Sequence, residues 1–413
     1  MTARTLGIIA DDLTGAMDSS GYFASRGLST IVILDPNFSS SADVVVINTN
    51  SRADDRGTAS EKVRQAARNL AGRLVYKKID STLRGNVGAE LEAVIKELAC
   101  EKAIVAPAFP AVGRTTVDGI LLVGGVKVTE TQFAHDPISP VGESHIPTLL
   151  GKTTGHRIGH IAVQDINAGP ASLYRKISKM SPEIVVCDAT EQSHLSGIAQ
   201  AAALAKNRWL LCGSGGLARE LQVLLEEITS PSALNSINPL SGPALIVVGT
   251  RNQMTASQLL KAKGELGIPV LNLKVENLRP ENVSFDRVAP IVEEAGCLLS
   301  QGKGLALSST FSQYVPALKQ FLPFLIAEVV AGILKVQNIA GLFLSGGDIA
   351  SGVCTKLSIS AILVHGEVEP GIPAGELVGG QGRGMRVVTK AGGFGTEAAI
   401  IKSIPYLERG YLT

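Results

Sequence analysis

The chain has 413 residues, of which 45% are hydrophobic and 44 are glycine, and this composition excludes a fibrous or disordered protein. Its 38 basic and 37 acidic residues leave a net charge of +1, so no general electrostatic attraction draws nucleic acid or a membrane surface to it. The length suits two domains of roughly 100 to 200 residues each, and the aliphatic composition favours an α/β fold.

The cysteines and the hydropathy pattern indicate a cytoplasmic protein. Five cysteines lie far apart and form no C-x-x-C pair, which is typical of reduced thiols. The apolar run at residues 6–10 stops at Asp11 and is not a signal sequence, and no stretch approaches the ~20 apolar residues of a membrane span. The sequence leaves the oligomeric state open, a homo-oligomer included.

The first half of the chain alternates buried strands with helices. Residues 6–10 predict a strand covered on both faces. A helix that ends at Gly27 is predicted to follow it, and residues 29–34 predict the next strand. Further strands are predicted at residues 44–48, 74–78 and 102–106. In such βαβ units ligands bind at the carboxyl ends of the parallel strands.

Polar loops follow four of these strands. They carry Asp11 and Asp12, then Arg52, then Lys78 with Asp80 and Arg84, and then Arg114. If the strands are neighbours in one sheet, these side chains converge into a pocket of positive groups with two or three carboxylates. Arginine binds carboxylates bidentately, lysine offers a compact charge, and aspartate accepts hydrogen bonds from sugar hydroxyls or serves as a base. The pattern favours a small, oxygen-rich anion as ligand, although any one of these side chains taken alone could be a solvated surface group.

A hairpin interrupts this alternation after the fourth strand. Two β-rich runs within residues 118–131 are joined by Gly124 and Gly125, a two-residue turn signal. The hairpin is either a flap over the pocket or an extension of the sheet. In the Pro-rich loop beyond it, His135 and Asp136 are further candidates for the site.

A segment rich in Ser, Asn and Pro predicts a linker at residues 229–242, between domains at 1–228 and 243–413. The second domain repeats the strand-to-helix pattern at three corners. These corners carry Thr250, then Gly346, Gly347 and Asp348, then Lys390, Gly392 and Gly393. Glycines at such corners let the backbone approach a polyphosphate beside a helix N-terminus. We therefore expect a nucleotide there, with Lys390 on phosphate and Asp348 on Mg²⁺ or ribose.

Five segments resemble the motifs of the four-carbon acid sugar kinase family. They are ADDLTGAMD (10–18), YKKIDSTLRGN (76–86), APAFPAVGRTT (106–116), LSGGDIASGV (344–353) and TKAGGFGTE (389–397). The resemblance spans nearly the whole chain. It implies two lobes, each a mostly parallel sheet flanked by helices, with an active-site cleft between them. It also implies ATP-dependent phosphorylation of the terminal hydroxyl of a four-carbon sugar acid.

The resemblance also implies roles for individual residues. The substrate would contact Asp11, Asp12, Arg52, Lys78, Asp80, Ser81 and Arg84. ATP would contact Thr250, where relatives are expected to carry serine, the turn at Gly346 to Asp348, and Gly392. Within the family, the segments INTNSRA, GRTTVDG and ETQFAHDP are more similar to the D-threonate kinases than to the 3-oxo-tetronate kinases.

For the mechanism, we hypothesise that Asp12 or Asp80 accepts the proton of the attacking hydroxyl, while Lys78, Arg84 and Mg²⁺ offset the charge of the transferring phosphoryl group. Two other classes of function stay open. One is a nicotinamide-dependent hydroxy-acid oxidoreductase, disfavoured because no G-x-G-x-x-G follows the first strand. The other is a non-catalytic sensor of sugar acids that binds a nucleotide.

Overall fold

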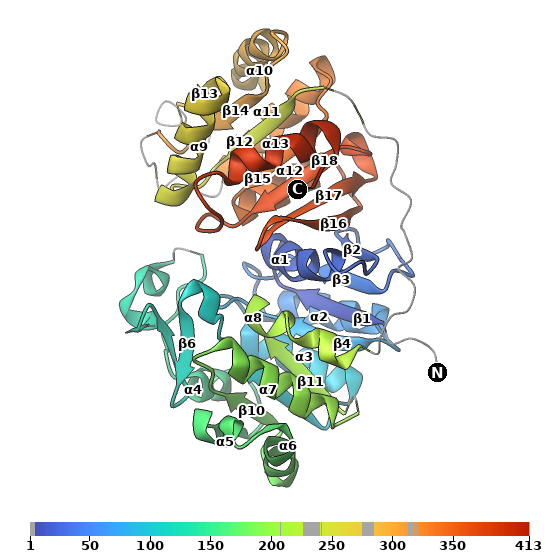
Figure 1. The fold of residues 1–413 in the computed structure, drawn as a ribbon, viewed down its shortest axis with the longest axis vertical. Helices are drawn as coiled ribbons and strands as arrows, with labels where there is room; N and C mark the ends of the chain where they lie inside the picture. Colours follow the sequence, from blue (N-terminus) through green and yellow to red (C-terminus); the bar gives the residue numbers. More distant parts are fainter. Residues whose placement is uncertain are drawn as a thin grey trace. The chain divides into compact units, whose positions relative to one another are not determined.

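The computed structural model forms two compact units, one of Met1–Ser19 with Ser41–Pro231 (unit 1) and one of Ser20–Ser40 with Ser232–Thr413 (unit 2) (Figure 1). It describes residues 5–136, 138–206, 208–225, 240, 242–274, 285–312, 315, 318 and 321–412. The linker predicted at residues 229–242 lies outside this part except for Leu240 and Gly242. The predicted domain boundaries stay a prediction. Residues 20–40 belong to unit 2 by their contacts within the chain, although they lie in the first half of the sequence.

Unit 1 is built on a parallel sheet with the strand order β3-β1-β4-β11-β5-β10-β9. The strands are β1 (Leu6–Ala10), β3 (Val44–Asn48), β4 (Leu74–Lys78), β5 (Lys102–Ala106), β9 (Ile158–Ile161), β10 (Ile184–Cys187) and β11 (Trp209–Gly213). The strands predicted at 6–10, 44–48, 74–78 and 102–106 are confirmed residue for residue. Every residue of β1 is buried, as its continuous apolar sequence requires.

Helices connect and flank these strands. They are α1 (Leu13–Ala24, which crosses into unit 2), α2 (Arg56–Asn69), α3 (Val87–Leu98), α4 (Ile146–Gly151), α5 (Val163–Asn167), α6 (Pro170–Lys179), α7 (Gln192–Ala203) and α8 (Gly215–Ala218). Helix α2 begins where the Asp55 side chain accepts from the backbone N–H groups of Gly57 and Thr58. Helix α3 buries Val87, Leu91, Val94 and Ile95 on one face.

The predicted hairpin forms a separate antiparallel sheet of β6 (Arg114–Val117), β7 (Ile120–Val123) and β8 (Val126–Lys127). Gly124 and Gly125 both have positive φ, as a two-residue turn requires. The alternative that the hairpin extends the main sheet is therefore wrong. The turn between β6 and β7 is held in place by Asp188, whose carboxylate accepts from the backbone N–H groups of Asp118 and Gly119 at 2.8 and 2.9 Å.

Unit 2 is also built on mostly parallel strands. Strands β13 (Val270–Asn272), β14 (Leu305–Ser308), β12 (Ala244–Val248), β15 (Gly341–Ser345) and β18 (Arg386–Lys390) are parallel neighbours in that order. Strands β17 (Ile372–Val378), β16 (Ala361–Glu369) and β2 (Thr30–Ile33) then continue the sheet with antiparallel pairing. The strand predicted at residues 29–34 thus pairs with β16, from the far end of the chain.

The helices of unit 2 are α9 (Gln253–Leu266), α10 (Phe285–Leu299), α11 (Leu322–Val336), α12 (Gly347–Lys356) and α13 (Ala399–Arg409). A buried cluster that includes Ile246, Phe343 and Tyr406 joins the sheet to α9 and α13. Within the described part of the chain, no helix combines the length and apolar character needed to cross a membrane.

Candidate functional site

Strands β3, β1 and β4 end at the same level of the unit 1 sheet. Ala10 pairs with Asn48 on one side and with Lys78 on the other, so the loops that leave these strands start side by side. Strand β11 also ends at this level, with Gly213 paired to Lys78, and it separates β4 from β5. The predicted adjacency therefore holds for three of the four strands, and the loop to Arg114 starts two strands beyond β4.

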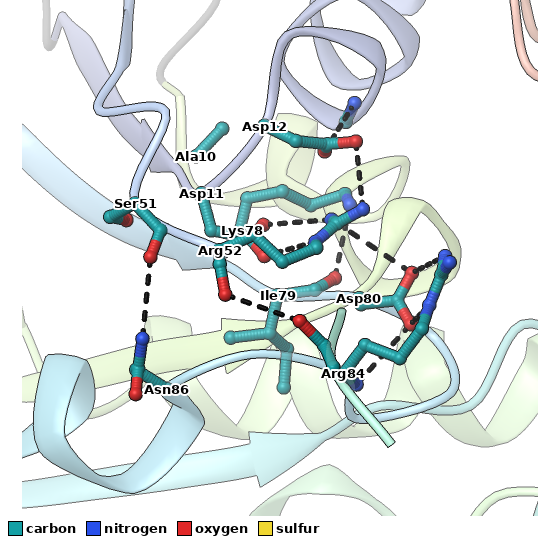
Figure 2. A network of polar contacts seen from close by, with 12 residues as sticks. Ala10, Asp11, Asp12, Ser51, Arg52, Lys78, Ile79, Asp80, Arg84 and Asn86 are labelled. Carbon is teal, nitrogen blue, oxygen red and sulfur yellow. Dashed lines mark hydrogen bonds and ion pairs between the residues drawn. The ribbon is translucent and has the colours of Figure 1, made fainter. Parts of the chain in front are cut away.

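Arg52 lies at the centre of the converging loops (Figure 2). Its Nε and Nη2 donate to the two oxygens of Asp11 at 2.7 and 3.1 Å, and its Nη1 donates to Asp12 Oδ2 at 2.8 Å. Nη2 also lies 3.9 Å from Asp80 Oδ1. Burial alone would lower the pKa of Arg52, but the three carboxylates raise it well above its usual value. Arg52 is therefore a permanent cation that ties three loops together.

Asp11 and Asp12 follow β1 and hold Arg52 from one side. Burial opposes ionisation of Asp11, yet the charges of Arg52 and Lys77 outweigh it and hold the pKa of this carboxyl below its usual value. Asp12 also begins helix α1, since its Oδ1 accepts from the backbone N–H of Gly15 at 2.9 Å. Both oxygens of Asp12 are thus engaged, one by the helix and one by Arg52.

Asp80 organises the turn that follows β4. Arg84 donates to its two oxygens from Nε and Nη2, each at 2.9 Å, and the Thr82 hydroxyl and backbone N–H donate to Oδ2. Burial would raise the pKa of Asp80, but the charges of Arg84 and Arg52 hold it well below its usual value. Ser81 lies half-buried in the same turn.

This turn has a backbone that few residues tolerate. Leu83 has φ +64°, which is costly for a bulky side chain, and Gly85 has φ +90°. A Cβ at Gly85 would lie 3.1 Å from Arg52 Cγ. The glycine therefore lets the turn pass close to Arg52, and the strained conformation brings Arg84 back onto Asp80.

Lys78 is a buried cation without an ion pair among the described residues. It is 5% exposed, and its Nζ donates to the carbonyl of Ile79 at 3.0 Å. A Cβ at Gly15 would lie 2.9 Å from Lys78 Nζ and 2.6 Å from Asp12 Oδ1, so the glycine leaves room for both groups. A buried charge is costly unless it is paired, so Lys78 is a strong candidate to bind an anion.

Arg114 is another cation of unit 1 without an ion pair among the described residues. It is half-buried, its Nη1 donates to the carbonyl of Val112, and its Nε is buried with no hydrogen-bond partner there. Burial lowers its pKa, and the nearby charge of Asp80 opposes this effect. Although β5 is not adjacent to β4, Arg114 thus lies within electrostatic reach of the site.

The loop after β8 also reaches this cluster. Arg84 Nη1 lies 3.5 Å from Asp136 Oδ2, and the Ser139 hydroxyl donates to the carbonyl of Arg52 at 3.3 Å. The ring of Phe133 lies 5.5 Å from the Arg84 guanidinium carbon. Asp136, left open by the sequence, therefore contacts the site, whereas His135 is exposed.

A buried ion pair behind the site was missed by sequence reasoning. Lys77 Nζ lies 2.8 Å from Glu90 Oε2, with the two side chains 0% and 1% exposed, and the Ser51 hydroxyl donates to Glu90 Oε1 at 2.6 Å. The pair fixes the start of α3 and the loop that carries Arg52. The available signal was a glutamate among the apolar positions of α3, next to a strand in which Lys77 and Lys78 alternate faces.

In unit 2, three strand-to-helix corners also meet. Val248 of β12 pairs with Ser345 of β15, which pairs with Lys390 of β18, so these neighbouring strands end level. The corners that follow them carry the predicted nucleotide contacts. The carboxyl edge of a parallel sheet is where ligands bind in such folds.

Thr250, Gly346 and Gly392 lie together at this edge. A Cβ on Gly392 would lie 2.7 Å from Thr250 Oγ1, and one on Gly346 would lie 4.0 Å from Thr250 Cβ. Gly346 has φ +109° and precedes α12, whose first turn has no side-chain cap. Glycine is therefore required at two of the three corners, and the first N–H groups of a helix, which lack partners within the helix itself, can bind an anion.

Asp348 and Gly393 lie on the outside of this region. Both are exposed, and Gly347 between Gly346 and Asp348 is half-buried. A carboxylate oxygen is a ligand that Mg²⁺ prefers, and nucleotide phosphates commonly complete its coordination. An exposed Asp348 fits this arrangement, and no group of three or more potential metal ligands occurs among the residues that the structure describes.

Lys390 is buried beneath the glycine loop that it precedes. Its Nζ donates to Thr255 Oγ1 at 3.0 Å and to the carbonyls of Ala391, Gly392 and Phe394 at 2.9, 3.0 and 3.3 Å. Burial lowers the pKa of Lys390 to about 8. Its ammonium therefore holds the loop in shape, and its predicted contact with phosphate stays a prediction.

Comparison with known proteins fits this division. A model of a sugar-binding N-terminal domain matches residues 6–221, and a model of a nucleotide-binding C-terminal domain matches residues 245–400. A D-threonate kinase of Salmonella typhimurium is 34% identical over 426 residues, covering 98% of each chain. The chain belongs to the four-carbon acid sugar kinase family.

Other members of this family differ in the acid named. A D-erythronate kinase of Heliobacterium modesticaldum is 30% identical, covering 97% of this chain and 96% of the relative. A 3-oxo-tetronate kinase of Salmonella typhimurium is 28% identical, covering 96% and 98%. A solved structure of a Salmonella typhimurium protein shares the fold, with a TM-score of 0.81 at 24% identity, covering 97% of this chain and 98% of that one.

Proposed function

We propose that this protein is an ATP-dependent kinase of a four-carbon sugar acid. The observation that carries the proposal is the charge arrangement at one edge of the unit 1 sheet. Three carboxylates are fixed by Arg52 and Arg84, while Lys78 and Arg114 lie nearby without an ion-pair partner in the described part of the chain. Such a site offers acceptors for sugar hydroxyls together with cations for an acid group.

The preferred substrate in this proposal is D-threonate, with 4-phospho-D-threonate as the product. D-threonate kinases of three organisms are each 34% identical to this chain, while the D-erythronate kinase is 30% and the 3-oxo-tetronate kinases are 26 to 28% identical. This gradient supports the resemblance in the segments at Arg52 and Arg114. D-erythronate and the 3-oxo acids are the alternatives, because a few side chains decide a difference of one hydroxyl.

Unit 1 binds the acid in this proposal. Arg52 and Arg84 hold Asp11, Asp12 and Asp80 in fixed positions, so that hydroxyl groups of the acid meet acceptors that need no rearrangement. Lys78 and Arg114 supply the positive charge that the carboxylate of the acid and the transferring phosphoryl group require.

Unit 2 binds the nucleotide, and Thr250, Gly346, Gly347, Asp348, Gly392 and Gly393 are the proposed contacts. The absence of side chains at Gly346 and Gly392 lets the phosphates approach the backbone, and Lys390 maintains the loop. Mg²⁺, when bound through Asp348 and the phosphates, would neutralise charge on the phosphates. The need for ATP and five cysteines without a disulfide support a cytoplasmic location.

A coupled assay for ADP release tests the proposal. The purified protein is given ATP, Mg²⁺ and each of D-threonate, L-threonate, D-erythronate and the 3-oxo acids. ADP release that depends on the acid supports a kinase. Acid-dependent reduction of a nicotinamide cofactor without ADP would indicate the oxidoreductase, and binding of acid and ATP without turnover would indicate the sensor.

A further inference from the structure

Asp18 lies in the middle of helix α1, and its carboxylate takes no part in the contacts of the site described above. Its Oδ1 is buried and has no hydrogen-bond partner among the described residues. A buried acceptor without a partner costs free energy, so a native structure that keeps one calls for an explanation.

The other carboxylates of the site are fully engaged. Both oxygens of Asp11 accept hydrogen bonds from Arg52, and both oxygens of Asp80 accept hydrogen bonds from Arg84. One oxygen of Asp12 accepts a hydrogen bond from Arg52, and the other accepts one from a backbone N–H of α1. Each of these three carboxylates positions cations or a helix, and a proton could be added to it only by weakening those contacts.

The backbone near Asp18 is shaped around its carboxylate. A Cβ at Gly215 would lie 2.4 Å from Asp18 Oδ2 and 2.9 Å from the ring of Phe109. Gly215 follows β11, the strand next to β4, so Asp18 lies at the same sheet edge as Lys78. The glycine leaves the space that the carboxylate occupies.

The charged groups that act on Asp18 are Lys78 from β4, Arg219 after α8 and Asp12 at the start of α1. Burial has the largest effect and raises the pKa of Asp18, because it outweighs the two cations. A carboxylate with a raised pKa is a stronger base than Asp80, whose pKa is held low.

We propose that Asp18 is the general base of the phosphoryl transfer. This inference rests on the proposed kinase function. The Asp18 carboxylate accepts the proton of the acid's terminal hydroxyl while the hydroxyl oxygen forms a bond to the terminal phosphorus of ATP. The bond from that phosphorus to the bridging oxygen breaks, and its electron pair leaves on ADP. Lys78, beside Asp18, offsets the negative charge of the transferring group, and the proton on Asp18 then passes to solvent.

The test compares Asp18→Asn with Asp12→Asn and Asp80→Asn in the full-length protein. For Asp18→Asn we expect kcat to fall by about 10²- to 10⁴-fold, the usual contribution of a general base, with KM for acid and ATP nearly unchanged. For the other two variants we expect KM for the acid to rise, because Arg52 or Arg84 loses its partner. Asp165→Asn, a surface change on α5, is the matched control and should retain wild-type kinetics.

The pH profile separates a base from a merely structural carboxylate. For the wild type, kcat/KM should fall toward acid pH as Asp18 is protonated, and this limb should be absent in Asp18→Asn. Retention of more than half of kcat in a folded Asp18→Asn protein, or an unchanged acid limb, would overturn the inference.

Two further arms keep the test decisive. If Asp18→Asn does not fold by circular dichroism, Gly215→Ala replaces it, since the added methyl group displaces the carboxylate; a lower kcat is expected, and an unchanged kcat would refute the role. If the wild type phosphorylates no acid, the proposed function itself has failed. If the wild type is active and the variants do not behave as stated, only the assignment of Asp18 has failed.

Discussion

Arg52 and Asp11 are joined by two parallel hydrogen bonds of 2.7 and 3.1 Å, from the side of the guanidinium to both carboxylate oxygens. This arrangement fixes the plane of the guanidinium and directs its remaining edge toward Asp12 and Asp80. The acid-binding loops of unit 1 are therefore positioned by one arginine, and changes that move Arg52 should affect acid binding before they affect the fold.

Gly85→Ala should move Arg52. The new Cβ would lie 3.1 Å from Arg52 Cγ at φ +90°, so we expect a loss of about 1 to 3 kcal/mol in unfolding free energy and a higher KM for the acid. Gly72→Ala is the matched control, since Gly72 has φ +86° and no atom within 4 Å of an added Cβ. It should lose similar stability with unchanged KM. Equal KM values for the two variants in the ADP-release assay would contradict the proposed role of Gly85.

Asp80→Asn should destabilise the protein in a pH-dependent way. The pKa of Asp80 is held well below its usual value, so its ionised form stabilises the folded state above about pH 4, and that contribution is lost as the pH falls through the folded-state value. We expect a loss of about 3 kcal/mol at neutral pH, because Arg84 loses its partner. Urea unfolding at pH 7 and pH 3.5 measures this, and a difference between the two proteins that does not shrink at the lower pH would be evidence against it.

The buried pair of Lys77 and Glu90 should show strong coupling. Removing one partner, as in Glu90→Leu, leaves a buried charge and should cost about 3 to 5 kcal/mol. The double variant Lys77→Met with Glu90→Leu should recover most of this loss, because neither charge remains. Breaking the exposed pair of Arg68 and Glu97 should cost under about 1 kcal/mol. A double-mutant cycle by urea unfolding checks this, and additive losses would disprove the coupling.

Gly392→Ala should weaken nucleotide binding. The added Cβ would lie 2.7 Å from Thr250 Oγ1, so two of the proposed contacts would be pushed apart, and KM for ATP should rise about tenfold or more. Gly393→Ala, whose Cβ would lie 3.6 Å from Asn252 Nδ2, should have a smaller effect. KM for the acid should change little in either variant. Equal KM values for ATP would show that the approach to Thr250 does not matter.

Continuous apolar runs made four strands of unit 1 predictable. Strands β1, β3, β4 and β5 begin and end at the predicted residues. Each is a short apolar run next to polar residues such as Asp, Asn or Lys, and only one placement of such a run buries all of its apolar side chains. The insertion of β11 between β4 and β5, and the pairing of β2 with β16, depend on contacts between residues far apart in the sequence. No local pattern encodes such pairings.

For the site, residue type and strand position were enough to bring Asp11, Asp12, Arg52, Lys78 and Asp80 to one sheet edge. Which carboxylate pairs with which cation was not predictable, because the strained turn at Leu83 and the glycines at 15 and 85 set those distances. The free oxygen of Asp18 was hidden for the same reason. It lies inside a segment that the sequence singled out, but its environment is formed by Gly215, nearly two hundred residues later.

Product formation by the wild-type protein tests the central claim most directly. ADP release with each acid of the panel is measured together with mass and ³¹P NMR analysis of the product. We predict ADP in equal amount to a monophosphate on the C4 oxygen, with kcat/KM for D-threonate at least about tenfold above the other acids. ADP release no higher with any acid of the panel than in its absence would contradict the account.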